Sequence, residues 1–364
     1  MKITLISTST YPSDQGIRTV SSYLKKHDYE VKLVFLTASE NYKKLYSKKV
    51  LRQLEKICIG SSIIGVSAYA STYKRASQVI RYLKKLRAPI IYGGVHPTIS
   101  PELCIKEADF VCVGEGEEAM LELANCIKNK KSTSNIKNIW VNQNGLVIKN
   151  PVRPVIEDLD KLPFADYEIQ DHYILERNKI IKFQERHFNG QIFFLTGRGC
   201  PYSCTYCSNA HFNKLYPRQK PVRWHSINYI IDCIVNLKSK FKTLSYFDIR
   251  DDTFSFRPTE QIKEFNQKYK EKVHMRFKCL GDPKTIDDEK IRLLVDAGCT
   301  DIIIGIQGGE RVNLEVYKRN QTDEQVLRSA QILNKYKKLK SVRLFAKIKP
   351  WDNDLNVETS YSSF

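Results

Sequence analysis

Phe193-Phe194-Leu195-Thr196-Gly197-Arg198-Gly199-Cys200-Pro201-Tyr202-Ser203-Cys204-Thr205-Tyr206-Cys207 is the segment around which this chain is organised. An apolar run ends in a Gly-Arg-Gly turn, and three cysteines follow with C-x3-C-x2-C spacing. This order predicts a buried strand that carries a loop of thiolates at its carboxyl end. Clustered thiolates suit a soft metal centre, which is either an iron–sulfur cluster or zinc.

Zinc is the main alternative to an iron–sulfur cluster at these cysteines. His211 follows Cys207 after three residues and would complete a set of three thiolates and one imidazole. A structural zinc knuckle usually lies among turns and short hairpins, whereas this loop leaves an apolar strand.

Each iron of a cubane cluster normally takes one thiolate, so three local cysteines leave one iron open for a substrate or cofactor. Ten cysteines without a signal peptide indicate a reducing compartment, which argues against disulfides.

The cysteine spacing resembles the C-x3-C-x-aromatic-C signature of the radical S-adenosylmethionine (radical SAM) superfamily, with Tyr206 in the aromatic position. The resemblance implies a [4Fe–4S] cluster on Cys200, Cys204 and Cys207, whose open iron is chelated by the amino and carboxylate groups of S-adenosylmethionine. It implies further that one electron from the cluster cleaves the sulfonium and yields a 5′-deoxyadenosyl radical. Tyr206 would then lie against the adenine.

The resemblance extends to three residues further along the chain. Asp251 and Asp252 follow an apolar strand, where the superfamily contacts the amino group of S-adenosylmethionine, and Gln307 stands at the place of the ribose. A capping role in a turn is an alternative for the aspartate pair. Strand parity predicts that Arg276 points to the same mouth.

The amino-terminal region alternates strands and helices, which favours an open parallel sheet with ligands at the carboxyl ends of its strands. The glycines of Gly93-Gly94 and Gly114-Glu115 follow two of these strands, and glycine lets a backbone approach a ligand closely. The expected strands are Lys2–Ile6, Val31–Leu36, Ile63–Ser67, Pro89–Tyr92 and Phe110–Val113.

The order of these glycine turns, upstream of the cysteine loop, resembles the cobalamin-binding domain of one radical SAM subfamily. The resemblance implies cobalamin near Gly93, Gly94, Gly114 and Glu115. Domains that ligate cobalt through histidine carry an Asp-x-His-x-x-Gly motif after the first strand, but the loop Ser7–Gly16 contains no histidine. Either cobalamin binds without a protein ligand to cobalt, or the domain no longer binds it.

The sequence predicts an α/β chain with a Rossmann-like, cobalamin-binding-type sheet followed by a partial (β/α) TIM-like radical SAM barrel. We expect residues 1–130 to form the cobalamin-binding-like domain, 131–185 a linker and 186–364 the radical SAM core. Relatives continue beyond the last strand expected here, so the barrel is expected to be truncated at its carboxyl end. The strands expected after the cysteine loop are Leu244–Ile249, His274–Cys279, Asp301–Ile306 and Val342–Ile348.

Composition limits the possible partners. The net charge is +19, but lysines are spread along expected helix faces, which favours a solvated surface over a nucleic-acid interface. No segment approaches the ~20 apolar residues of a membrane span, and the amino terminus does not read as a signal peptide, so we expect a cytoplasmic protein.

The main hypothesis is a radical SAM enzyme that cleaves S-adenosylmethionine reductively, with cobalamin-dependent methyl transfer to carbon if cobalamin is bound. Some relatives form rings instead. We expect a small-molecule substrate and a reductant such as flavodoxin or ferredoxin. One alternative is a tRNA methylthiotransferase, although Cys58, Cys104, Cys112 and Cys126 do not offer the auxiliary-cluster pattern of those enzymes. A zinc-stabilised, non-catalytic binding protein is the other.

Overall fold

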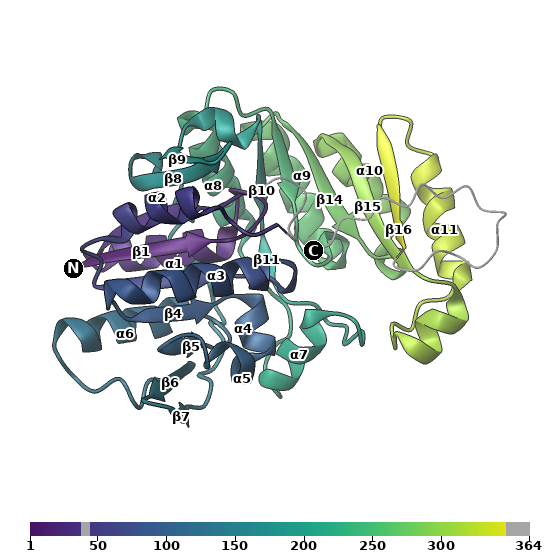
Figure 1. The fold of residues 1–364 in the computed structure, drawn as a ribbon. Helices are drawn as coiled ribbons and strands as arrows, with labels where there is room; N and C mark the ends of the chain where they lie inside the picture. Colours follow the sequence, from purple (N-terminus) through teal and green to yellow (C-terminus); the bar gives the residue numbers. More distant parts are fainter. Residues whose placement is uncertain (38–43, 347–364) are drawn as a thin grey trace. The chain divides into compact units, whose positions relative to one another are not determined.

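The computed structural model describes residues 1–37 and 44–346, and the chain divides into two compact units (Figure 1). The first unit contains Met1–Ile156 and Lys161–His187, and the second contains Glu157–Asp160 and residues 188–346. Both units are α/β structures, as the sequence predicts. Within the described ranges, no helix has the length and apolar character needed to cross a membrane.

A mixed sheet forms the centre of the first unit, in the order β7-β6-β5-β4-β3-β1-β2-β8-β9 (Figure 1). Strands β1 to β5 are parallel and correspond to the five strands predicted from the sequence, so the Rossmann-like core is confirmed. The strands are β1 (Lys2–Ser7), β2 (Glu30–Phe35), β3 (Ile63–Ser67), β4 (Ile90–Gly93), β5 (Phe110–Cys112), β6 (Ile139–Gln143), β7 (Leu146–Lys149), β8 (His172–Glu176) and β9 (Lys179–Lys182).

Helices cover both faces of this parallel core. Helix α1 packs against α6, and α2 packs against α3. Right-handed crossovers place α1 and α2 on opposite faces, so the strands between them are buried on both sides and consist of nearly continuous apolar runs. Ile3, Leu5 and Ile6 of β1 illustrate this, because all three are buried. The helices are α1 (Gln15–Lys26), α2 (Lys48–Cys58), α3 (Tyr73–Leu83), α4 (Val95–Ile99), α5 (Pro101–Cys104) and α6 (Glu117–Lys128).

Two hairpins from the segment after α6 extend this sheet at its two edges. Hairpin β6–β7 pairs antiparallel with β5 and turns at Asn144-Gly145, with both residues at positive φ. Hairpin β8–β9 joins the opposite edge through β2 and turns at Arg177-Asn178, also at positive φ. The sequence did not indicate this second hairpin, because its turn lacks the glycine that usually marks such a connection.

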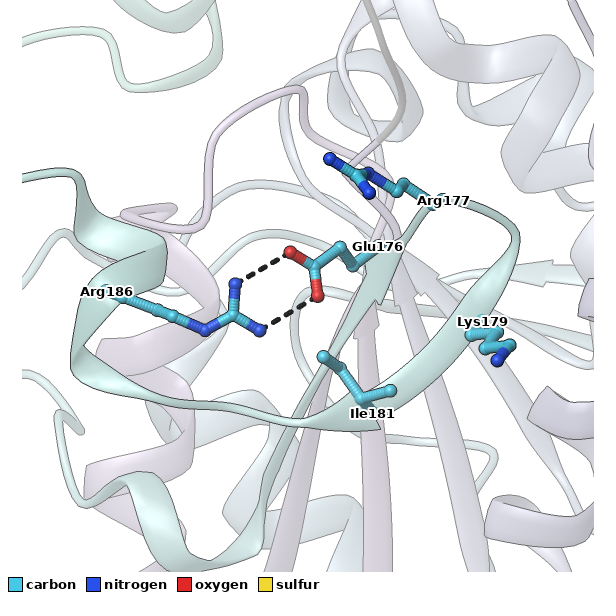
Figure 2. Close-up of a pocket in the computed structure, with 5 residues that line it drawn as sticks. All are labelled: Glu176, Arg177, Lys179, Ile181 and Arg186. Atoms are coloured by element: carbon cyan, nitrogen blue, oxygen red, sulfur yellow. Dashed lines mark hydrogen bonds and ion pairs between the residues drawn. The ribbon is translucent and has the colours of Figure 1, made fainter.

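The β8–β9 hairpin borders a surface hollow lined by charged side chains (Figure 2). Figure 2 shows Arg186 donating two hydrogen bonds to the carboxylate of Glu176, at 2.8 and 2.9 Å. Both side chains of the pair are exposed, so the pair adds little to stability.

The second unit is built on a parallel sheet in the order β10-β13-β14-β15-β16 (Figure 1). Strand–helix alternation and strand order agree with the predicted partial (β/α) barrel. Ser226 caps α8, since its hydroxyl accepts a hydrogen bond of 3.1 Å from the Tyr229 amide. The elements are β10 (Gln191–Phe194), β11 (Gly197–Arg198), α7 (Ser208–Leu215), β12 (Arg223–Trp224), α8 (Ile227–Lys240), β13 (Tyr246–Ile249), α9 (Thr259–Lys272), β14 (Arg276–Gly281), α10 (Asp288–Ala297), β15 (Cys299–Gln307), α11 (Asp323–Asn334) and β16 (Ser341–Ala346).

The prediction for Arg276 was wrong. Arg276 is the first residue of β14, so it lies at the amino end of the strand, away from the mouth formed by the carboxyl ends. The predicted strand began at His274, but His274 has a φ of 52° and belongs to the preceding turn. Residues 347–364, which include the end of the last predicted strand and the expected truncation, lie outside the described part of the chain.

Candidate functional site

The cysteine loop leaves the carboxyl end of β10, as predicted, and its path is set by two glycines. Gly197 and Arg198 form β11, which pairs antiparallel with β12. Gly199 has a φ of +86°, and a Cβ at this position would lie 1.9 Å from the carbonyl oxygen of Pro221. Only glycine allows the chain to pass Pro221, just before β12, this closely before it reaches Cys200.

The three cysteines occupy one short segment between β11 and α7. Cys204 is buried, and Cys200 and Cys207 are half-buried. The side-chain amide of Asn213 on α7 donates to the backbone carbonyl of Cys200 at 3.3 Å, and that of Asn209 lies 3.7 Å from the Cys207 sulfur. Helix α7 therefore braces the loop from its carboxyl side.

Two of the three thiols, those of Cys200 and Cys207, favour the protonated form. Burial, with the nearby carboxylate of Asp252, raises the pKa of Cys200 to about 12, and burial also raises the pKa of Cys207. A bound metal centre would reverse this preference, since its positive charge favours thiolates. Among residues 1–37 and 44–346, no three His, Cys, Asp or Glu side chains are arranged to hold a single metal ion. The assignment of Cys200, Cys204 and Cys207 as cluster ligands remains a prediction.

Tyr206 is held by residues that follow β15. Its hydroxyl accepts a hydrogen bond of 2.9 Å from Arg319, and its ring packs edge-on against Tyr317 with centroids 4.7 Å apart. The backbone amide of Thr205 also donates to the carbonyl of Tyr317, at 3.0 Å. Arg319 and Tyr317 were not predicted as site residues, because neither belongs to a motif contiguous with the cysteines.

Gln307 ends β15 in a strained conformation. It is buried and has a φ of +62°, a value uncommon for residues other than glycine, asparagine and aspartate. Within the described residues its side-chain oxygen Oε1 is buried and has no hydrogen-bond partner. A buried acceptor of this kind is costly unless a ligand supplies a donor, and a ribose hydroxyl is such a donor.

Asp251 and Asp252 have different environments despite being adjacent. Asp251 is buried, and both its oxygens accept hydrogen bonds from Thr196. Asp252 is accessible to solvent. The protein atoms crowded around its carboxyl group, together with the charge of Asp251, raise the pKa of Asp252 to about 6, and a hydrogen bond with Asn209 partly offsets this rise. Of the two, Asp252 is the carboxylate that is open to a ligand.

The sheet of the second unit also carries a row of charged side chains that was not predicted from the sequence. Asp248 of β13 is fully buried, and its Oδ2 lies 2.8 Å from both Lys278 of β14 and Arg250. Asp248 and Lys278 are register partners on neighbouring strands. Alternation along β13 would have revealed Tyr246, Asp248 and Arg250 on one face, but the apolar residues between them dominated the pattern.

In the first unit, the predicted glycine turns lie at one edge because β4 pairs with β5. Gly94 and Gly114 both have positive φ, and a Cβ at Gly94 would lie 2.8 Å from the Ser67 hydroxyl and 2.9 Å from the Ala68 carbonyl. The carboxylate of Glu115 accepts a hydrogen bond of 2.9 Å from the Ile156 amide. Gly93, Gly94 and Gly114 leave this edge without side chains, which suits the close approach of a large flat ligand.

The loop after β1, where histidine ligands to cobalt occur in other domains, is closed on itself. The hydroxyl of Ser7 donates to Asp14 at 2.6 Å, and Tyr69 also bonds to this carboxylate. Burial raises the pKa of Asp14, against the effects of Ser7 and Arg18. The loop therefore offers no histidine to a cobalt ion, and Ser7 and Tyr69 already occupy its buried carboxylate.

Comparison with protein families matches both units. The B12 binding domain model covers residues 1–124, and the Radical SAM superfamily model covers residues 194–345. This chain belongs to the cobalamin-binding radical SAM family. The match confirms the predicted order of a B12-binding domain followed by a radical SAM domain, and it implies a [4Fe–4S] cluster, S-adenosylmethionine and cobalamin as cofactors.

Similar proteins agree with this family. The chain is 24% identical over 282 residues to an uncharacterised methyltransferase of Pyrococcus horikoshii, a match covering 75% of this chain and 58% of that protein. It is 26% identical over 331 residues to an anaerobic magnesium-protoporphyrin IX monomethyl ester cyclase of Rubrivivax gelatinosus, a match covering 86% of this chain and 55% of that protein. The chain thus spans less than two thirds of the length of these curated relatives.

The fold also resembles a solved member of this radical SAM family. The structure of the radical SAM methyltransferase TsrM from Kitasatospora setae, with cobalamin and a [4Fe–4S] cluster bound, aligns with a TM-score of 0.74. The alignment covers 95% of this chain and 69% of that protein at 16% identity. These comparisons favour the radical SAM hypothesis over the methylthiotransferase and zinc alternatives.

Proposed function

We propose that this chain acts as a radical SAM enzyme that uses a [4Fe–4S] cluster and S-adenosylmethionine, with cobalamin-dependent methyl transfer to a carbon atom of a small molecule. The observation that carries the proposal is the cysteine loop at the carboxyl end of β10, in a parallel sheet where Asp252 follows the end of β13 and Gln307 ends β15. Ligands of such sheets bind at the carboxyl ends of the strands.

In this proposal, Cys200, Cys204 and Cys207 hold the cluster. The cluster, when bound, supplies the electron that cleaves the sulfonium of S-adenosylmethionine to a 5′-deoxyadenosyl radical. Tyr206 packs against the adenine, Asp252 accepts from the cationic amino group, and the unpartnered Oε1 of Gln307 accepts from a ribose hydroxyl. Asp251 supports the site indirectly, because its carboxylate is occupied by Thr196.

The first unit is proposed to hold cobalamin at the edge formed by Gly93, Gly94, Gly114 and Glu115. Cobalamin, when bound, supplies the capacity to transfer a methyl group to an unactivated carbon. Ring formation is the second candidate reaction, since a cyclase is among the similar proteins. Methyl transfer is placed first because a methyltransferase is both a curated relative and a structural neighbour.

The remaining components follow from this chemistry. Cleavage of the sulfonium needs one electron from outside the chain, so we propose a reductant of the flavodoxin or ferredoxin type. A reducing compartment would keep the cysteines of the loop available to a cluster, so we propose a cytoplasmic location.

Anaerobic reconstitution with iron and sulfide tests the cluster. Wild-type protein is expected to take up iron and sulfide and to develop a broad visible absorbance. Cys204→Ser should lose this absorbance, whereas Cys126→Ser, which changes a half-buried cysteine outside the loop, should keep it. Stoichiometric zinc without the visible band, or full iron content in the triple variant of Cys200, Cys204 and Cys207, would reject the proposal.

A second assay tests the reaction. The reconstituted protein, with dithionite as the electron source, is expected to convert S-adenosylmethionine to 5′-deoxyadenosine. Mass spectrometry of the product distinguishes this cleavage from simple hydrolysis. Absorbance after incubation with hydroxocobalamin and desalting reports separately whether the first unit retains cobalamin.

A further inference from the structure

We propose that Arg319 is a positioning residue that locks Tyr206 of the cysteine loop to the carboxyl ends of β14 and β15, and thereby orients the Tyr206 ring for the adenine of S-adenosylmethionine. The inference rests on the proposed function and deepens it.

Arg319 reaches three segments that are distant in the sequence. Its Nη1 donates to the Tyr206 hydroxyl at 2.9 Å. Its Nη2 lies 2.6 Å from the Asp282 carboxylate, just after β14, and 3.0 Å from the Gly305 carbonyl in β15. Its Nε donates to Gln321 at 2.8 Å. The planar guanidinium group can serve several acceptors in fixed directions, which the single ammonium of lysine cannot do.

The partners of Arg319 are themselves held in place. Only 11% of the Arg319 side chain and 3% of the Asp282 side chain is exposed. The Asp282 amide donates to the Ser255 hydroxyl at 3.1 Å, and the other carboxylate oxygen of Asp282 accepts from the Lys284 amide at 3.0 Å. An ion pair that is buried and hydrogen-bonded on both sides has one geometry, so it transmits that geometry to Tyr206.

Gly305 allows Arg319 to approach β15. A Cβ at Gly305 would lie 2.9 Å from the Gln307 Nε2 and 3.3 Å from the Arg319 Nη2. These two distances show that the side chains of Gln307 and Arg319 both lie next to Gly305. Arg319 therefore stands beside both residues proposed to contact the nucleoside, Tyr206 for the adenine and Gln307 for the ribose.

The experiment measures binding of S-adenosylmethionine to anaerobically reconstituted protein by equilibrium dialysis, with the EPR spectrum of the reduced cluster recorded with and without S-adenosylmethionine. The variants are Arg319→Met, Arg319→Lys, Tyr206→Phe and the double variant of Arg319→Met with Tyr206→Phe. Arg328→Met, which removes an exposed arginine from α11, is the matched control.

We expect Arg319→Met to weaken binding about tenfold, the equivalent of one hydrogen bond to a charged group, and Tyr206→Phe to weaken it about threefold. The double variant should bind no more weakly than Arg319→Met alone, since both substitutions break the same contact. Arg319→Lys should resemble Arg319→Met, and Arg328→Met should resemble the wild type. Wild-type affinity in Arg319→Met, or effects that multiply in the double variant, would overturn the inference.

Three outcomes distinguish a failure of the positioning role of Arg319 from a failure of folding or of the proposed function. If Arg319→Met does not fold, as judged by its thermal unfolding, the comparison of Tyr206→Phe with Arg319→Lys decides, and wild-type affinity in both overturns the inference. If the wild type takes up no cluster or no S-adenosylmethionine, the proposed function fails and the role of Arg319 fails with it. Wild-type binding combined with an unaffected Arg319→Met rejects the positioning role alone.

Discussion

Thr196 and Asp251 connect the two strand ends that frame the cysteine loop. The Thr196 amide donates to Asp251 at 2.6 Å, and the Thr196 hydroxyl donates to the other carboxylate oxygen. Arg257, fully buried, donates to the Thr196 carbonyl and hydroxyl at 2.8 Å each. Thr196, just after β10, is thus held against Asp251, just after β13.

Asp251→Asn is expected to destabilise the protein. The amide nitrogen of asparagine would face a donor of Thr196 and leave it unsatisfied, which costs about 1–3 kcal/mol. Chemical denaturation of the metal-free protein, under anaerobic and reducing conditions, measures the free energy of unfolding. A stability equal to the wild type would show that Thr196 and Arg257 do not depend on this carboxylate.

Asp252→Asn is expected to leave the stability of the protein nearly unchanged and to weaken ligand binding. Because Asp252 is exposed, its substitution should change the free energy of unfolding by less than about 0.5 kcal/mol. It should weaken binding of S-adenosylmethionine about tenfold, since a charge-assisted hydrogen bond to the amino group is lost. Equilibrium dialysis on the reconstituted variant checks this, and unchanged affinity would assign the amino group to a different residue.

Gln307→Gly is expected to separate stability from binding. Glycine adopts the left-handed conformation of this residue without strain, and the change also removes the unpartnered Oε1. We expect the free energy of unfolding to rise by about 1 kcal/mol, while the affinity for S-adenosylmethionine falls. A variant that is less stable than the wild type would mean that packing of the glutamine side chain outweighs the backbone strain.

Gly94→Ala is expected to impair the first unit, with Gly60→Ala as its control. Both glycines have positive φ, so both substitutions incur a conformational cost of about 1 kcal/mol. A Cβ meets nothing within 4 Å at Gly60, whereas at Gly94 it approaches Ser67 and Ala68 within 3 Å. Gly94→Ala should therefore unfold more easily than Gly60→Ala and retain less cobalamin after desalting. Equal melting temperatures would show that the β4 turn adjusts without cost.

His225 is expected to make stability depend on pH. Burial lowers its pKa to about 4, while Asp160 opposes this and the cations of Arg198 and Arg257 reinforce it. The unfolded histidine titrates near its ordinary value of 6.5, so the unfolded state binds the proton first as the pH falls. Stability is therefore complete above about pH 6.5 and decreases toward pH 4, by up to about 3 kcal/mol from this group.

His225→Gln provides the test of that assignment. Glutamine can still donate to Asp160, whose carboxylate lies 3.0 Å from the histidine Nδ1, but it does not titrate. The difference in unfolding free energy between pH 7 and pH 5 should be smaller in the variant than in the wild type. Parallel pH profiles would place the titration on another group.

Residues close together in the sequence allowed much of the fold to be predicted. The apolar strand, the glycine turn and the cysteines of residues 193–207 are contiguous, so their order alone places the loop at the carboxyl end of β10. The helix cap at Ser226 and the turn at Asn144-Gly145 are local in the same sense, because each acts on its immediate neighbours in the sequence. Hairpin β8–β9 was not predicted because its Arg177-Asn178 turn lacks glycine, and its edge position depends on pairing with the distant β2.

The surroundings of the cysteine loop depend on contacts between distant residues. Arg319 and Tyr206 are 113 positions apart, and Thr196 and Asp251 are 55 apart. Hydrophobic periodicity and motif spacing describe single elements, so they do not specify which side chains meet when strands align. The order of strand, turn and thiolates follows from local chemistry. The different environments of Asp251 and Asp252 arise only in the tertiary structure, because packing buries the first carboxylate and leaves the second in contact with solvent.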